Sequence, residues 1–212
     1  MASIKSRLNF RRCRTGLRQG ALLLLGCIVL PVKTQAEPEI NISKIYYTIE
    51  GNSADAILAD IHRKTPVKHN GKQHSARTDW HVSWQFWWNG SGNSCEISKV
   101  TTRLEVVYTL PRLKISSSMS EELLARWETF NTALFSHEQG HKDLGVRAAN
   151  EIENRITAMG ARDSCSRLEG DANRIARDVI EQYGRMEKEY DRTTNHGINT
   201  GAFFHSDSYS EP

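Results

Sequence analysis

Two long runs of alternating apolar and polar residues in the middle of the chain predict a pair of β-strands. The first begins at Trp80 and the second covers residues 95–110, with a Gly-rich turn at 89–93 between them and Pro111 after the second. Alternation with a period of two places successive side chains on opposite faces of a sheet, so the two runs predict an antiparallel hairpin. We interpret the apolar face of the first run as core, with a sugar-stacking platform as the alternative. This face consists of Trp80, Val82, Trp84, Phe86 and Trp88.

The chain before the hairpin predicts one further strand and one short helix. Residues 40–50 alternate in the manner of a strand, with apolar side chains at Ile45, Tyr47 and Ile49. A helix capped by Ser53 follows and ends before Pro66. Residues 67–79 are polar, and we interpret them as an exposed loop whose histidines are not ligands.

After the hairpin, apolar residues recur at helical spacing. A capping box at Ser118 and Glu121 opens this pattern, which continues to Gly160. Its first apolar positions are Leu123, Trp127, Phe130 and Leu134. A second helix is expected from residues 163–164 to about Met186.

The elements together predict an α+β fold. We expect a small antiparallel sheet packed against the long helix and a second C-terminal helix. One domain is expected over residues 37–204, followed by a polar and disordered tail at 205–212.

The five residues His137-Glu138-Gln139-Gly140-His141 lie within the long helix and have the form H-E-x-x-H. Two histidines four residues apart share one helix face, where their imidazoles can bind one Zn²⁺. Both continue the apolar stripe and face the interior, where a metal satisfies their ring nitrogens. Glu138 lies beside them, where a carboxylate can take a proton from the zinc-activated water. Gly140 disfavours a helix, which suggests a close approach at this point. The alternative is an ordinary pair of histidines without a metal.

A catalytic zinc needs a third protein ligand, and the extended H-E-x-x-H-x-x-G-x-x-H motif does not supply it here. Leu144 and Arg147 occupy the places of its glycine and third histidine. We therefore expect the ligand from a later segment, with His196 as the first choice. Asp191 is the second choice, or else the partner that orients an imidazole. Further candidates on the second helix are Glu169 and Asp171.

Residues 1–36 predict a secretory signal peptide. A basic leader precedes an apolar run from Ala21 to Val32, and cleavage is expected after Ala36. Lipoprotein cleavage at Cys27 is the weaker alternative because the apolar run continues past it. Residues 37–212 then hold 21 basic and 25 acidic residues, a net charge of −4. No basic stripe for nucleic acid remains, and we expect a periplasmic or secreted protein without stable membrane insertion.

Cysteine usage agrees with export. Cys13 and Cys27 lie in the predicted signal peptide, so Cys95 and Cys165 remain as one pair in an oxidising compartment. We expect a disulfide between these two, with separate buried thiols as the alternative.

Several of these features occur in the same order in a known group of proteins. They are Trp80-x-x-x-Trp84, Cys95, His137-Glu138-Gln139-Gly140-His141, Cys165 and Tyr190-Asp191-x-x-Thr194-x-His196-Gly197-x-x-x-Gly201-Ala202. With them the chain resembles a bacterial family of uncharacterised exported proteins described as predicted secreted zinc-dependent proteases. The resemblance covers nearly all of the mature chain and implies a zincin-type metallopeptidase.

We therefore expect an exported zinc metallopeptidase that acts on peptides or proteins, with Glu138 as general base. The zinc ligands would be His137, His141 and His196. Tyr190 and His81 are candidates for stabilising the oxyanion. One alternative is a non-catalytic module in which zinc only clamps the helix to the C-terminal segment. Another is a cell-wall peptide amidase that uses the same site. The sequence does not indicate the oligomeric state.

Overall fold

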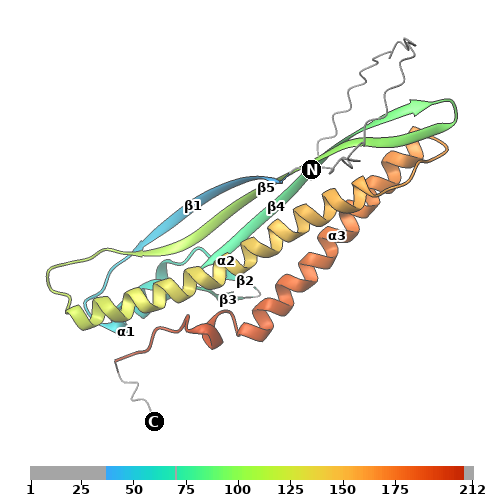
Figure 1. Ribbon diagram of the computed structural model, residues 1–212. Coiled ribbons are helices and arrows are strands. Elements are labelled where there is room, and N and C mark those ends of the chain that lie inside the picture. Colours follow the sequence, from blue (N-terminus) through green and yellow to red (C-terminus); the bar gives the residue numbers. More distant parts are fainter. Residues whose placement is uncertain (1–36, 70, 208–212) are drawn as a thin grey trace, which may run out of the picture.

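A three-stranded sheet covered on one face by two long helices makes up most of the fold (Figure 1). This computed structural model describes residues 37–69 and 71–207, so the predicted signal peptide and residues 208–212 of the predicted tail lie outside the described residues. The elements in chain order are β1 (Glu39–Ile49), α1 (Ala54–Lys64), β2 (Lys68–His69), β3 (Lys72–Gln73), β4 (Arg77–Ser91), β5 (Ser94–Leu113), α2 (Glu121–Thr157), α3 (Cys165–Thr194) and a 3-10 helix (Ile198–Thr200). The predicted α+β class is confirmed.

The sheet has the order β1-β5-β4. β4 and β5 form the predicted antiparallel hairpin, in which Trp80 pairs with Val106. β1 runs parallel to β5, with Ile40 opposite Leu104. The sheet is therefore mixed rather than purely antiparallel. Residues 67–79, expected to be a loop, contain the short β2–β3 hairpin and the beginning of β4.

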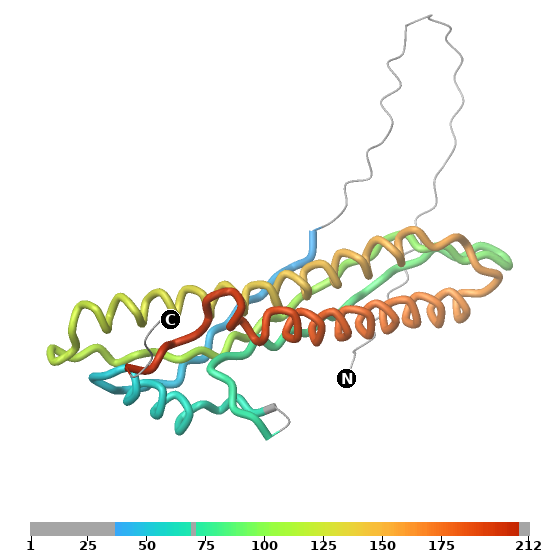
Figure 2. The backbone as a smooth tube through the Cα atoms, turned by 90° about the horizontal axis from the view of Figure 1, so that it is seen from below, coloured from blue at the N-terminus to red at the C-terminus, as the bar shows by residue number. Residues whose placement is uncertain are grey.

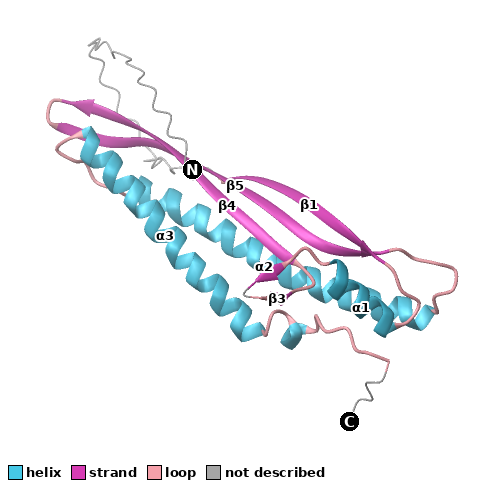
Figure 3. Ribbon diagram, turned by 180° about the vertical axis from the view of Figure 1, so that it is seen from behind, coloured by secondary structure: helices cyan, strands magenta, loops and turns pink. Residues whose placement is uncertain are grey.

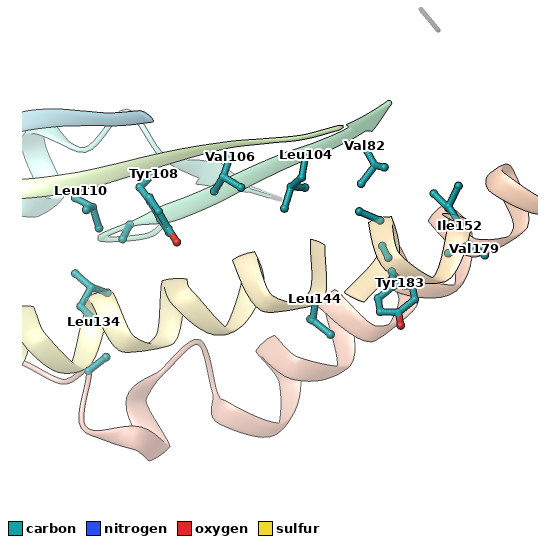
Figure 4. Close-up of a cluster of buried hydrophobic side chains, with 14 of the residues drawn as sticks. Val82, Leu104, Val106, Tyr108, Leu110, Leu134, Leu144, Ile152, Val179 and Tyr183 are labelled. Carbon is teal, nitrogen blue, oxygen red and sulfur yellow. The ribbon is translucent and has the colours of Figure 1, made fainter. Parts of the chain in front are cut away.

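The core lies between the sheet and the two long helices (Figure 4). Alternate side chains of the hairpin point toward α2, among them Val82, Leu104 and Tyr108. Leu134 of α2 faces the sheet, while Leu144 lies toward α3. The apolar face of β4 is core as predicted, because Val82 and Phe86 are buried and its tryptophans pack against the same cluster.

Both long helices differ from the prediction at one end. Ser120, rather than Ser118, caps α2, because its hydroxyl accepts a hydrogen bond of 3.1 Å from the backbone N–H of Leu123. α3 continues to Thr194 instead of ending near Met186. Its last two turns were missed because the side chains that face α2 there are polar.

The C-terminal segment runs between α1 and the first half of α2 (Figure 2). Phe204 packs against the rings of Trp127 and Phe130, with centroids 5.9 and 5.3 Å away. A carboxylate oxygen of Asp207 accepts a hydrogen bond of 3.0 Å from the backbone N–H of Ala54. Through these contacts, the segment that follows α3 packs against the end of the molecule that also contains α1.

A disulfide joins Cys95 to Cys165, as predicted, with Cα atoms 5.1 Å apart. It ties the β4–β5 hairpin to the beginning of α3, where the tip of the hairpin lies beside the α2–α3 loop (Figure 3). A disulfide points to an oxidising compartment. In the part of the chain that the structure describes, no helix combines the length and apolar character needed to cross a membrane.

Candidate metal centre

Three ionisable side chains converge where the middle of α2 meets the last turns of α3. Nε2 of His137 lies 3.3 Å from Nε2 of His141. Oδ1 of Asp191 lies 3.3 Å from the first of these nitrogens and 3.1 Å from the second. Both histidines are buried, with 4% and 6% of their surface exposed. We call His137, His141 and Asp191 the donor triad.

The spacing of the donor triad fits a divalent metal ion. In a tetrahedral site with bonds of about 2.0–2.1 Å, neighbouring ligand atoms lie about 3.3–3.4 Å apart. The three separations of 3.3, 3.3 and 3.1 Å in the donor triad are close to that value. In the part of the chain that the structure describes, the donor triad is the group of histidines and acids whose donor atoms all lie within 4.8 Å of one another. The donor triad could therefore hold a metal ion and leave one coordination position without a protein ligand.

A different contact orients each imidazole of the donor triad. Nδ1 of His141 lies 2.9 Å from Oε2 of Glu187, whose other oxygen accepts a hydrogen bond of 2.9 Å from the indole N–H of Trp80. When Nδ1 donates its proton to Glu187, the lone pair of Nε2 is directed at the other donors. His137 instead stacks on the ring of Tyr190, with centroids 4.9 Å apart and planes inclined by 10°. Its buried Nδ1 has no hydrogen-bond partner among the described residues.

The acids around His141 favour a positive charge at the donor triad. Burial by itself lowers the pKa of His141, but hydrogen bonds to Asp191 and Glu187, together with their charges, raise it to about 10. Burial raises the pKa of Asp191, but hydrogen bonds from His137 and His141 outweigh this effect and hold the pKa well below its usual range. In the metal-free protein, a proton on His141 supplies the favoured charge. A divalent ion would replace this proton and release it on binding.

Glu138 is buried on the side of α2 that faces the sheet, with 4% of its surface exposed. Its Oε2 accepts a hydrogen bond of 2.6 Å from the hydroxyl of Thr78 on β4. Burial raises the pKa of this carboxyl, although the bond from Thr78 and the nearby charges of His141 and His137 lower it in part. A carboxyl group with a raised pKa is suited to accept a proton and return it near neutral pH.

Gly140 allows α3 to approach α2 closely beside the donor triad. A Cβ at this position would overlap the hydroxyl and the ring of Tyr190. The Tyr190 hydroxyl donates a hydrogen bond of 3.3 Å to the backbone carbonyl of His137. Because Tyr190 directly precedes Asp191, this contact helps to position the carboxylate of the donor triad. The close approach at Gly140 is made by the side chain of Tyr190.

Replacing Gly140 with alanine is expected to destabilise the protein, although alanine is the better helix former. The added methyl group would displace Tyr190, and such overpacking costs on the order of 1–3 kcal/mol. Gly170→Ala and Gly184→Ala on α3 are matched controls, because nothing lies within 4 Å of a Cβ at either position. Each control should stabilise the helix by roughly 0.5–1 kcal/mol. Denaturant unfolding measures all three variants, and a stabilising Gly140→Ala would contradict the packing described above.

His196 lies beside the donor triad rather than within it. Its Nδ1 is 3.3 Å from Oδ1 of Asp191, and its side chain is 48% exposed. It does not belong to the group of donor atoms that all lie within 4.8 Å of one another. The geometry therefore favours Asp191 over His196 as the third donor, the reverse of the order expected from the sequence.

The two residues considered as oxyanion donors are not directed at the donor triad. The hydroxyl of Tyr190 is bonded to the backbone carbonyl of His137. His81 is exposed and alternates with Trp80 and Val82, which places it on the sheet face opposite α2. Tyr190 is therefore a positioning residue in this structure, and His81 is remote from the site.

Sequence reasoning missed Glu187 and Thr78. Glu187 precedes Asp191 by four residues, so both lie on one face of a helix, and this spacing could have identified it. Thr78 lay in a segment interpreted as a loop, and no sequence signal connected it to Glu138.

A separate cavity of about 420 Å³ is lined by β1, the end of β5 and the first half of α2. Its lining includes Lys44, Tyr46, Leu110, Trp127 and Phe135. No residue of the donor triad contributes to this lining, so the cavity is not part of the candidate metal centre.

Comparison with protein-family models gives a match over most of the chain. The family described as "Bacterial protein of unknown function (DUF922)" matches residues 44–197, well over half of the chain. The chain belongs to the DUF922 family. The matched part includes the donor triad, Glu138 and Glu187. No curated protein and no solved structure matches the chain. Membership of the DUF922 family does not indicate an activity, so we infer the function from the geometry and chemistry of the site.

Proposed function

We propose that this DUF922 protein is an exported, zinc-dependent hydrolase that cleaves peptide bonds. The observation that carries the proposal is the spacing of the donor triad, with a buried carboxyl group beside it. The motif order also resembles that of uncharacterised exported proteins described as predicted secreted zinc-dependent proteases. The Cys95–Cys165 disulfide supports a periplasmic or secreted location.

The choice of zinc rests on the donors and on Glu138. Two imidazoles and one carboxylate are found in catalytic zinc sites, and also in Fe(II) oxygenases. Hydrolysis at zinc requires a base beside the metal, whereas oxygenase chemistry does not. Glu138 supplies such a group from the residue that follows a metal-binding histidine. Zinc hydrolysis therefore explains why a carboxylate lies beside the donor triad, whereas iron chemistry leaves Glu138 without a role.

Each residue of the centre has a role in this proposal. The donor triad would hold a zinc ion, which polarises a carbonyl and lowers the pKa of water toward 7. Glu138 accepts the proton of the attacking water and passes it to the leaving amine. Thr78 holds one carboxylate oxygen of Glu138 and so limits rotation of the base. Glu187 holds His141 in the tautomer that a metal requires.

A purely structural zinc is less consistent with this geometry. Structural zinc sites are closed by four protein ligands, whereas catalytic sites have three and an open position. The donor triad supplies three, and His196 lies outside the closely spaced group. A cell-wall peptide amidase would use the same three donors, so it differs from a peptidase only in its substrate.

Removal and return of the metal test the proposed activity. The mature chain should cleave members of a library of internally quenched peptides, or else cross-linked cell-wall peptides. Treatment with 1,10-phenanthroline should abolish this cleavage, and one equivalent of Zn²⁺ should restore it. Cleavage that persists in fully metal-free protein would refute a zinc mechanism.

A further inference from the structure

A tight turn after α3 brings His196 back to the donor triad. Asn195 and His196 have left-handed φ angles of 49° and 52°, and Gly197 follows at 87°. Left-handed φ angles are uncommon in residues other than glycine, although Asn and His adopt them more often than most. The backbone N–H of His196 donates a hydrogen bond of 2.9 Å to the carbonyl of Asp191. Unusual backbone geometry of this kind is concentrated at functional sites, where surrounding contacts maintain it.

Two contacts of Gly197, one with His137 and one with Ala202, hold this turn in place. A Cβ at Gly197 would come within 3.0 Å of the ring of His137, so the backbone passes directly over this member of the donor triad. The backbone N–H of Ala202 donates a hydrogen bond of 2.9 Å to the carbonyl of Gly197, and Ala202 is itself buried. The position of His196 is therefore fixed by the fold, even though its side chain is half exposed.

The His196 ring lies on the exposed side of the donor triad. His137 and His141 are buried, whereas the side chains of Asp191 and His196 are 33% and 48% exposed. A ligand can therefore reach the donor triad from the side of Asp191 and His196. His74, from the loop between β3 and β4, packs against the His196 ring with centroids 4.7 Å apart. The imidazole is thus held between a metal-binding carboxylate and a second ring.

We infer that His196 and the ion held by the donor triad together form a binding subsite for an anionic oxygen. The ligands it would take are carboxylates, hydroxamates and the oxyanion that develops during peptide hydrolysis. His196 would contact the ligand oxygen and would not coordinate the metal permanently. The inference rests on the proposed function in so far as it requires a metal at the donor triad. It also gives this chain the oxyanion-stabilising group that neither Tyr190 nor His81 supplies.

The test uses the mature chain loaded with Co²⁺, and acetohydroxamate as the probe. Binding of the probe is followed by the visible absorption of the cobalt, which needs no turnover. His196→Ala should keep one metal ion per chain and an unchanged resting spectrum, while its affinity for acetohydroxamate falls about 10–100-fold. His81→Ala is the matched control and should leave the affinity unchanged, because that histidine is exposed on the far face of the sheet.

His196→Gly is the second variant, since glycine adopts the left-handed φ without strain and preserves the turn if alanine disturbs it. Loss of the metal in both variants would make His196 a ligand and overturn the inference, as would unchanged probe affinity in His196→Gly. If the wild-type protein cleaves no peptide but the probe still distinguishes these variants, the subsite stands and the peptidase proposal fails. If peptides are cleaved, the same variants should lower kcat more than they raise KM.

Discussion

Glu138→Gln is expected to lower the rate of peptide cleavage by about 10²–10⁴-fold, the contribution of a positioned general base. Glutamine has nearly the same shape but cannot accept the proton of the attacking water. Its amide oxygen can still accept the hydrogen bond from Thr78, so the helix should remain in place. Steady-state kinetics measures the rate, and mass spectrometry of the intact protein or elemental analysis measures the bound metal. Zinc should remain at one ion per chain.

The matched control is Glu153→Gln. Glu153 is also buried on α2, with 5% of its surface exposed, and accepts a hydrogen bond of 3.2 Å from Thr102. It lies four turns beyond Glu138 and outside the donor triad. The control should have a similar effect on stability and leave kcat within about twofold of wild type. A Glu138→Gln protein that retains full activity would exclude Glu138 as the base.

Asp191→Ala is expected to remove the metal and, with it, all activity. The change deletes one of three donors and one of the two ion pairs that His141 makes with described residues, while the pair with Glu187 remains. Loss of a group that merely orients a ligand typically weakens metal affinity 10–100-fold, and loss of a donor should weaken it more. Competition with a chromophoric chelator measures this affinity.

Asp178→Ala is the control for this variant, because Asp178 is an exposed aspartate on the same helix. It should bind zinc as the wild-type protein does. His196→Ala provides the decisive contrast, since the sequence alone placed His196 ahead of Asp191 as the third ligand. Zinc affinity that survives in Asp191→Ala but is lost in His196→Ala would reverse the assignment made from the geometry.

Much of the fold was predictable because its main elements have strong periodic patterns. The β4–β5 hairpin and α2 bury one face each, so apolar residues recur with periods of two and about 3.6. The parallel pairing of β1 with β5 was not predictable, because alternation along a strand specifies neither its neighbour nor its direction. The last turns of α3 were missed because Glu187 and Asp191 face α2 at positions where hydropathy would require apolar residues.

The candidate site was predictable only where a motif fixes the geometry. The H-E-x-x-H spacing on a helix places His137 and His141 together, whatever surrounds them. The choice between Asp191 and His196 depends on where α3 ends, and the sequence pattern did not show this. On a helix that continues to Thr194, Asp191 faces α2, whereas His196 lies beyond the helix end in a left-handed turn. The role of Thr78 depends on a long-range contact with Glu138 that no local pattern encodes. Glu187, in contrast, could have been identified from its position four residues before Asp191.

Diffraction from crystals of the zinc-loaded mature chain, recorded on both sides of the zinc absorption edge, tests the metal centre most directly. We predict one anomalous peak per chain, about 2.0–2.2 Å from His137 Nε2, His141 Nε2 and a carboxylate oxygen of Asp191, with no fourth protein ligand. A map without a peak at these atoms, or with His196 closing the site as a fourth ligand, would contradict the account of a catalytic zinc centre.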